Sequence, residues 1–166
     1  MFVYERTLLE GYDKTQEVIE GIDSVFLKTA LTPYRRGLSA LNQAEELIAM
    51  IEKKQRLIDL YYDIKESLDA IKPKFKRILG ERYGFMGDGV SGVQDRNYYR
   101  KLLLSTDKFA KAMADKGYTA EKYAAIVKEF HFLDEIFTDK LNSEKRAAKI
   151  GKLRSAQSLK AASNCD

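Results

Sequence analysis

The stretch from Ser39 to Ile71, SALNQAEELIAMIEKKQRLIDLYYDIKESLDAI, contains the longest periodic segment of the chain. Apolar residues recur along it at helical spacing, so it predicts one long helix that Ser39 caps and that ends at Lys72-Pro73. The stripe comprises Leu41, Ala44, Leu47, Ile48, Ile51, Leu57, Ile58, Tyr61, Ile64, Leu68 and Ile71. It is wide and keeps no strict heptad, which favours packing in a small bundle. A homodimer formed through this helix stays open as an alternative.

The composition agrees with a helical fold. The 166 residues are 45% hydrophobic and 33% charged, with only two prolines and no tryptophan. A β-sandwich would require more glycine and proline for its turns. We therefore expect an all-α protein, a helical bundle with a long central helix. The net charge of +4 suits a nucleic-acid partner, but many proteins without such a partner carry the same excess.

The single cysteine and the N-terminal residues indicate the cellular compartment of the protein. Cys165 has no second cysteine with which to form an intrachain disulfide or a cysteine-based zinc site. The stretch Met1–Arg6 lacks the basic and apolar regions of a signal peptide, and no segment approaches the roughly 18 apolar residues of a membrane span. We expect a cytoplasmic protein that does not enter a membrane.

The N-terminal segment also has helical periodicity. Apolar residues recur from about Val3 to Thr29, and Gly11 and Gly21 are weak points within this pattern. The pattern predicts one interrupted helix or two short helices. Pro33 predicts a loop before the long helix.

The second half of the chain predicts several shorter helices. The segments Lys74–Tyr83 and Leu133–Leu141 are helical in pattern, and Thr119 is a candidate N-cap for a helix that runs through Phe130. A basic tail follows, with Lys145, Arg146, Lys149, Lys152, Arg154 and Lys160 and no acidic residue between them. It has few large apolar residues, so we expect a mobile arm.

A glycine-rich loop, with Gly84, Gly87, Gly89 and Gly92, separates Tyr83 from the next helix. A phosphate-binding loop would need a preceding strand and a terminal Gly-Lys-Ser or Gly-Lys-Thr, and both are missing. The loop is interpreted as a hinge or tight connection to the helix that follows.

That helix should begin after an Asp95 cap and stop at Gly117. Counting about 100° per residue, Tyr98, Leu102, Phe109 and Met113 share one side, with Tyr99, Leu103 and Ala110 beside them. The opposite side is basic and carries Arg96, Arg100, Lys101, Lys108 and Lys111. Its first turns include residue types that read base edges and phosphates, although a solvated surface face would look the same.

Two stretches resemble region 4 of sigma-70 family factors. Leu68–Phe85 is similar to its opening, and Asp95–Lys101 is similar to the start of its recognition helix. The resemblance implies a helix-turn-helix-like part that binds duplex DNA in transcription control, as in sigma-like regulators of phages and mobile elements. It places Arg96, Asn97, Arg100 and Lys101 toward the major groove. It also places Lys74, Lys76 and Arg77 near phosphates and makes RNA polymerase a candidate partner.

The chain departs from this family between Tyr83 and Asp95, where the family has a short helix and this sequence has mostly glycines and small residues. Tyr99 is added as a candidate contact from the same turns. The expected organisation is an N-terminal helical part (1–72), a DNA-binding part (73–142) and the basic tail (143–166).

The residues give little support to an enzyme. His131 is the only histidine, and no Glu-x-x-His spacing surrounds it. No nucleophile-elbow sequence is present either. We expect a partly buried histidine, no catalysis, and neither a metal nor a cofactor.

Two other functions stay open. In the first, the chain is a protein-binding adaptor whose partner surface includes Phe130, Phe132, Ile136 and Phe137. In the second, it binds RNA, and paired tyrosines such as Tyr98 and Tyr99 stack on unpaired bases. A large exposed apolar patch at the aromatic end would favour the adaptor, whereas a continuous basic face would favour DNA.

Overall fold

The computed structural model describes residues 2–31, 40–85 and 96–163, with side chains omitted for residue 40 and for 150–163. Within these ranges the chain forms helices and no strand, which confirms the all-α expectation. The helices are α1 (Val3–Leu31), α2 (Ala40–Ala70), α3 (Pro73–Tyr83), α4 (Arg96–Asp115), α5 (Ala120–Glu129) and α6 (His131–Ser163). The expected loop around Pro33, the caps at Ser39 and Asp95, and most of the glycine-rich loop lie outside the described residues.

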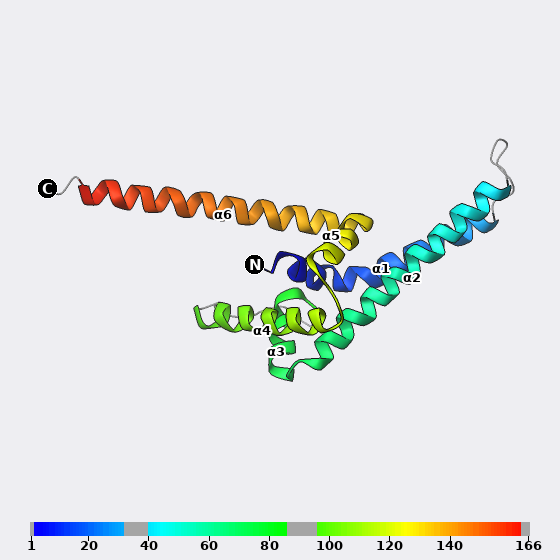
Figure 1. Cartoon of the computed structure of the whole chain (residues 1–166), viewed down its shortest axis with the longest axis horizontal. Coiled ribbons are helices and arrows are strands. Elements are labelled where there is room, and N and C mark those ends of the chain that lie inside the picture. Colours follow the sequence, from blue (N-terminus) through cyan, green and yellow to red (C-terminus); the bar gives the residue numbers. More distant parts are fainter. Residues whose placement is uncertain (1, 32–39, 86–95, 164–166) are drawn as a thin grey trace.

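Helices α1 and α2 form a long hairpin that extends from the rest of the molecule (Figure 1). The prediction that α1 is interrupted was wrong, because the helix continues through both Gly11 and Gly21. At Gly11 the reason is tertiary packing. A Cβ there would lie 2.6 Å from Leu133 Cδ2 and 3.3 Å from Phe132 Cε2, so the missing side chain makes room for α6. Packing of this kind routinely overrides helix propensity.

The hydrophobic core lies at one end of the hairpin, where the shorter helices gather around it (Figure 1). Four core residues show its reach: Leu8 from α1, Leu57 from α2, Leu79 from α3 and Phe109 from α4 are all at most 1% exposed. The core continues into α5 and α6 through residues that include Tyr123, Val127 and Leu133. One buried cluster therefore crosses the boundary that we expected at residue 72.

Local signals set several helix ends as predicted. Pro73 occupies the first turn of α3, and Gly84 ends that helix at φ 87°, with its N–H 2.8 Å from the Gly80 carbonyl. Gly117 follows α4 at φ 80°. The Thr119 hydroxyl accepts a hydrogen bond from the Lys122 N–H at 3.3 Å, which confirms Thr119 as the N-cap of α5.

Helix α6 is much longer than the predicted Leu133–Leu141. It runs without a break from His131 to Ser163, so no change of secondary structure marks the expected start of the tail at 143. Its first half packs antiparallel on α1, where Lys140 pairs with Glu10 and Arg6 with Glu144. Its second half extends beyond the core (Figure 1).

A polar cluster joins α2 to the turn after α4. The Tyr118 hydroxyl donates to the Asp63 carboxylate at 2.7 Å, and the Lys116 ammonium donates to Asp63 at 3.3 Å and to Glu66 at 2.5 Å. Tyr118 is only 6% exposed. Burial, followed by the hydrogen bond to Asp63, raises the pKa of Tyr118. The cluster holds the C-terminal end of α4 on α2.

The close contact at Gly11 predicts opposite effects for two glycine substitutions. Alanine adds helix propensity at either site, but only at Gly11 must the buried Leu133 move. No described atom would lie within 4 Å of a Cβ at Gly21. We expect Gly21→Ala to raise the free energy of unfolding by about 0.5–1 kcal/mol. We expect the free energy of unfolding of Gly11→Ala to be lower than that of Gly21→Ala by about 1–3 kcal/mol. Urea unfolding monitored by circular dichroism measures both free energies. Equal effects of the two substitutions would contradict the close packing at Gly11.

The cluster around Asp63 predicts that Tyr118→Phe weakens the fold. This substitution removes a hydrogen bond to a charged acceptor, so we expect it to lower the free energy of unfolding by about 1.5–3 kcal/mol. Tyr62→Phe is the matched control, because Tyr62 is 53% exposed and its loss should cost less than about 0.5 kcal/mol. Thermal and urea unfolding of the two variants should differ accordingly. An equally small effect at Tyr118 would show that the hydrogen bond adds nothing to stability.

Candidate nucleic-acid interface

The inner face of α4 is fixed by the core. Phe109 and Met113 are fully buried and Leu102 is nearly so, as the sequence predicted. Ser105 and Thr106 are also buried, which the apolar pattern did not indicate. Their hydroxyls donate to the Lys101 and Leu102 carbonyls at 2.8 and 3.0 Å, so both donors are satisfied within the helix. This packing leaves α4 little freedom to rotate about its own axis.

The outer face of α4 presents the predicted basic residues. Arg96, Asn97, Arg100 and Lys101 are exposed, and the three cations form no ion pair with another described residue. Lys111 is also exposed, but it pairs with Asp107 at 3.0 Å. Lys108, in the middle of the helix, is partly buried and also forms no ion pair with another described residue. Most of the unpaired positive charge of the described helix therefore lies in its first two turns.

The two tyrosines of these turns have different surroundings. Tyr98 packs against the core, as predicted, whereas Tyr99 is 53% exposed. Their rings meet edge to face, with centroids 5.7 Å apart. Leu103 and Leu104 are also about half exposed. The basic turns thus carry aromatic and aliphatic surface beside their cations.

The other predicted contacts lie at the far end of α3. Lys76 pairs with Asp69 at 2.5 Å and lowers the pKa of that carboxyl, and Arg77 pairs with Glu81 at 3.1 Å. The Lys74 ammonium lies 5.0 Å from the centroid of the Phe75 ring. These residues begin α3, whereas its last residues lie near Tyr98. Counted along the helix, Lys74, Lys76 and Arg77 lie about 7–12 Å before Arg82, and no described ion pair joins the two predicted groups.

Other cations occupy the end of α3 that faces the start of α4. The exposed Arg82 lies close enough to Tyr98 to lower its pKa, against the larger opposing effect of burial. Lys140 of α6 lies 5.9 Å from the Tyr83 ring centroid. Burial raises the pKa of Tyr83 to about 12, and the nearby Arg6 and Arg82 oppose that rise. No local sequence pattern predicts this group, because Arg82, Lys140 and Arg6 come from three separate helices.

Basic side chains of α6 complete this side of the molecule. Lys145, Arg146 and Lys149 are exposed. In Figure 1 the outer half of α6 and the first turns of α4 extend from the core in the same direction, opposite to the tip of the hairpin. The two basic segments therefore share one side of the fold.

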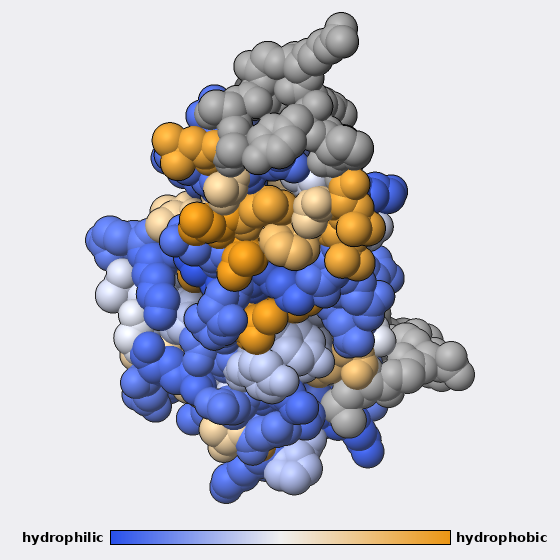
Figure 2. Space-filling view, turned by 90° about the vertical axis from the view of Figure 1, so that its right-hand side faces the viewer, coloured by the Kyte–Doolittle hydropathy of each residue, from blue (hydrophilic) through white to orange (hydrophobic). Residues whose placement is uncertain are grey.

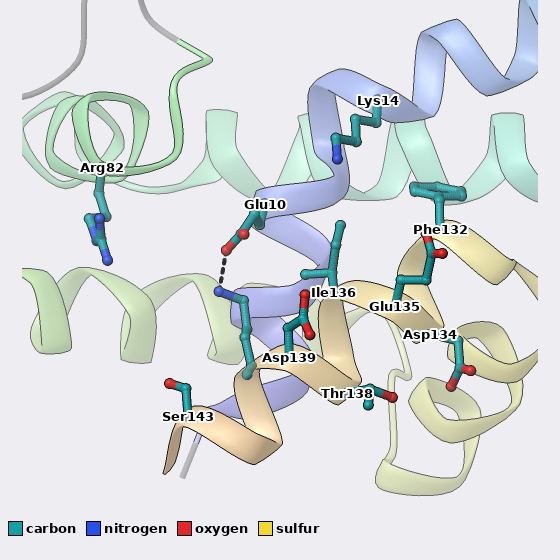
Figure 3. Close-up of a pocket in the computed structure, with 11 residues that line it drawn as sticks. Glu10, Lys14, Arg82, Phe132, Asp134, Glu135, Ile136, Thr138, Asp139 and Ser143 are labelled. Carbon is teal, nitrogen blue, oxygen red and sulfur yellow. Dashed lines mark hydrogen bonds and ion pairs between the residues drawn. The ribbon is translucent and has the colours of Figure 1, made fainter. Parts of the chain in front are cut away.

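A groove of about 730 Å³ lies between α1, α6 and the end of α3 (Figure 3). Glu10 and Lys140 form an ion pair within it, and Arg82 lies at its edge (Figure 3). Asp134, Glu135 and Asp139 add carboxylates, but among the described residues no three potential ligands are grouped to hold a metal ion. The groove is a region of mixed charge beside the basic turns.

His131 and the aromatic end differ from the predictions. The His131 side chain is 85% exposed and lies 3.5 Å from Glu135, because the residue begins α6 on the outside of the turn. It was expected to be partly buried. At the aromatic end Phe130 and Ile136 are buried, and Phe132 and Phe137 pack against the core. These four side chains mainly join α5 and α6 to the core, and Phe130 and Phe132 also line a groove of about 590 Å³ on the hairpin.

The comparisons with known proteins give no further guide. No family model matches the chain, and neither a curated protein nor a solved structure is significantly similar to it. No helix within the described ranges is long and apolar enough to cross a membrane.

Proposed function

We propose that this protein binds nucleic acid, specifically duplex DNA, through the first turns of α4. The observation that carries the proposal is the group Arg96, Arg100 and Lys101, whose charges are exposed and not neutralised within the described structure. The opposite face of the same helix is anchored in the core, so these cations project from a rigid support. An α-helix of this kind fits the major groove of B-form DNA.

The residues of these turns and their neighbours have the side chains needed for contacts with base edges and with phosphates. Arg96, Arg100 and Asn97 have the donors that pair with guanine and adenine edges, and Leu103 and Leu104 can contact a thymine methyl group. Arg82 and the exposed cations of α6 are better placed for phosphate contacts than Lys76 and Arg77, which are already in ion pairs. Transcription control, with RNA polymerase as a protein partner, is the setting we propose on the sequence resemblance alone.

The test is a comparison of two double substitutions of equal charge. Arg96→Ala/Arg100→Ala should weaken binding to a random duplex by roughly tenfold or more and reduce the slope of log affinity against log salt by about two. Lys74→Ala/Arg77→Ala removes the same formal charge from the first half of α3 and should leave the affinity within about threefold, because it acts only through screened, longer-range attraction. Fluorescence anisotropy across a salt series measures both.

Single-stranded DNA and RNA of the same length are the competing ligands. If either is bound more tightly than duplex DNA, the single strand is the target and Tyr99 is a candidate for stacking on its bases. Equal weakening by the two double substitutions would show diffuse electrostatic attraction without a site on α4. An absence of binding at low salt would end the proposal.

A further inference from the structure

The hairpin exposes most of the large apolar side chains that lie open to solvent in the described structure. They are Val25, Leu27, Leu31, Leu41, Ile48, Ile51 and Tyr62, each at least half exposed. Figure 2 looks at the hairpin end of the molecule and shows orange, apolar side chains gathered below the grey residues. Exposed apolar surface of this extent, rimmed by polar residues, commonly marks a protein-interaction site.

The exposed residues of α2 follow a heptad pattern. Steps of three and four residues connect Leu41, Ala44, Ile48, Ile51, Gln55, Ile58 and Tyr62, a set that we call the outer stripe. Six of these residues are exposed and Ile58 is partly buried. A different set, Leu57, Leu60, Ile64 and Leu68, is buried in the core. At about 100° per residue the two sets lie on nearly opposite sides of α2, so the core covers only one of its apolar faces.

A groove continues the outer stripe toward the core. It has a volume of about 370 Å³ and is lined by Gln16, Ile19, Ile58, Tyr61, Tyr62 and Lys65, where α1 and α2 meet. The stripe itself spans the 22 residues from Leu41 to Tyr62, or about 32 Å along the helix. Such a length offers three heptads of contact to a partner helix, in the manner of helix-in-groove recognition.

The rim of the outer stripe is acidic. Glu45, Glu52, Asp59 and Glu66 recur every seven residues along one flank, and all four are exposed. Glu66 is paired with Lys116 and Glu52 lies 4.0 Å from Arg56, whereas Glu45 and Asp59 form no ion pair with another described residue. On the other flank, Lys54 is already held by Asp23 of α1 at 2.6 Å, and Lys65 is exposed where the groove begins. Together α1 and α2 carry 13 acidic and 7 basic residues, although the whole chain has more basic than acidic residues. The stripe therefore lies in the acidic part of a basic protein.

This charge pattern indicates which kind of helix can pack on the outer stripe. Two copies of α2 packed antiparallel through their outer stripes would place the acidic flank of one against that of the other. A parallel pair would need the residues on the other flank, and Lys54 and Tyr61 there are turned toward α1. We propose that the outer stripe docks an amphipathic helix of another protein, one whose apolar seam is flanked by lysine or arginine. This surface is separate from the basic turns of α4 and goes beyond the proposed DNA binding.

The test uses the full chain and a designed helical peptide of three heptads, with isoleucine and leucine in the seam and lysine on both flanks. We expect saturable binding, weakened roughly tenfold or more when glutamate replaces the flanking lysines. A scrambled peptide of the same composition should not bind to the same extent. The protein variant Glu45→Lys/Glu52→Lys should reverse the preference between the lysine and glutamate peptides.

Two further variants locate the site on the hairpin. Ile48→Gln/Ile51→Gln should abolish peptide binding and leave the thermal unfolding temperature nearly unchanged, because both side chains are more than half exposed. Val25→Gln is the matched control. Val25 is 50% exposed but lines a separate groove with Val18, Met50 and Phe132, so this variant should bind normally.

Three results would overturn the proposal. Loss of binding in Val25→Gln but not in Ile48→Gln/Ile51→Gln would place the occupant in the other groove. Equal binding of the lysine and glutamate peptides would remove the basis for a basic partner. Self-association of the purified protein that Ile48→Gln/Ile51→Gln abolishes, measured by analytical ultracentrifugation, would make a second copy the occupant.

Discussion

The close approach of α6 to Gly11 is the contact on which the arrangement of this molecule depends. Because Gly11 has no side chain, Leu133 and Phe132 can pack directly against the backbone of α1. From this point α6 follows α1 toward its first residues, as the pairs Lys140–Glu10 and Arg6–Glu144 show. The basic half of α6 therefore leaves the core beside the start of α1. The outer half of the hairpin, in the opposite direction, is left without a covering helix (Figure 1).

The distribution of charge follows the same division. The two hairpin helices are acidic, and the cations that form no ion pair with a described residue include those of the first turns of α4. A polyanion approaching the molecule would be repelled by the hairpin and attracted to the other side. The two proposed surfaces would then be used by ligands of opposite charge. One chain could in this way hold a nucleic acid and a basic protein helix at the same time.

Features set by neighbouring residues could be predicted from the sequence. Pro73, Gly117 and Thr119 act through their own backbone or the next turn, and the inner face of α4 follows from helical period alone. The continuity of α1 through Gly11 depends on α6, which no local pattern indicates. In α2, periodicity revealed one wide stripe, although the structure divides it into a buried face and an outer face. Which face is covered depends on where α3 and α4 pack, so the sequence could not separate them.

The cluster at Asp63 holds the C-terminal end of α4, and the core holds its inner face as far as Tyr98. Tyr118 and Lys116 hold the C-terminal end of α4 against α2, and Phe109 and Met113 fix its rotation. The first turns are also held on their inner side, because Tyr98 and Leu102 pack on the core. Arg96, Arg100 and Lys101 can therefore remain exposed without loss of order in the helix axis. A rigid helix anchored along its inner face places its side chains more accurately than a loop would.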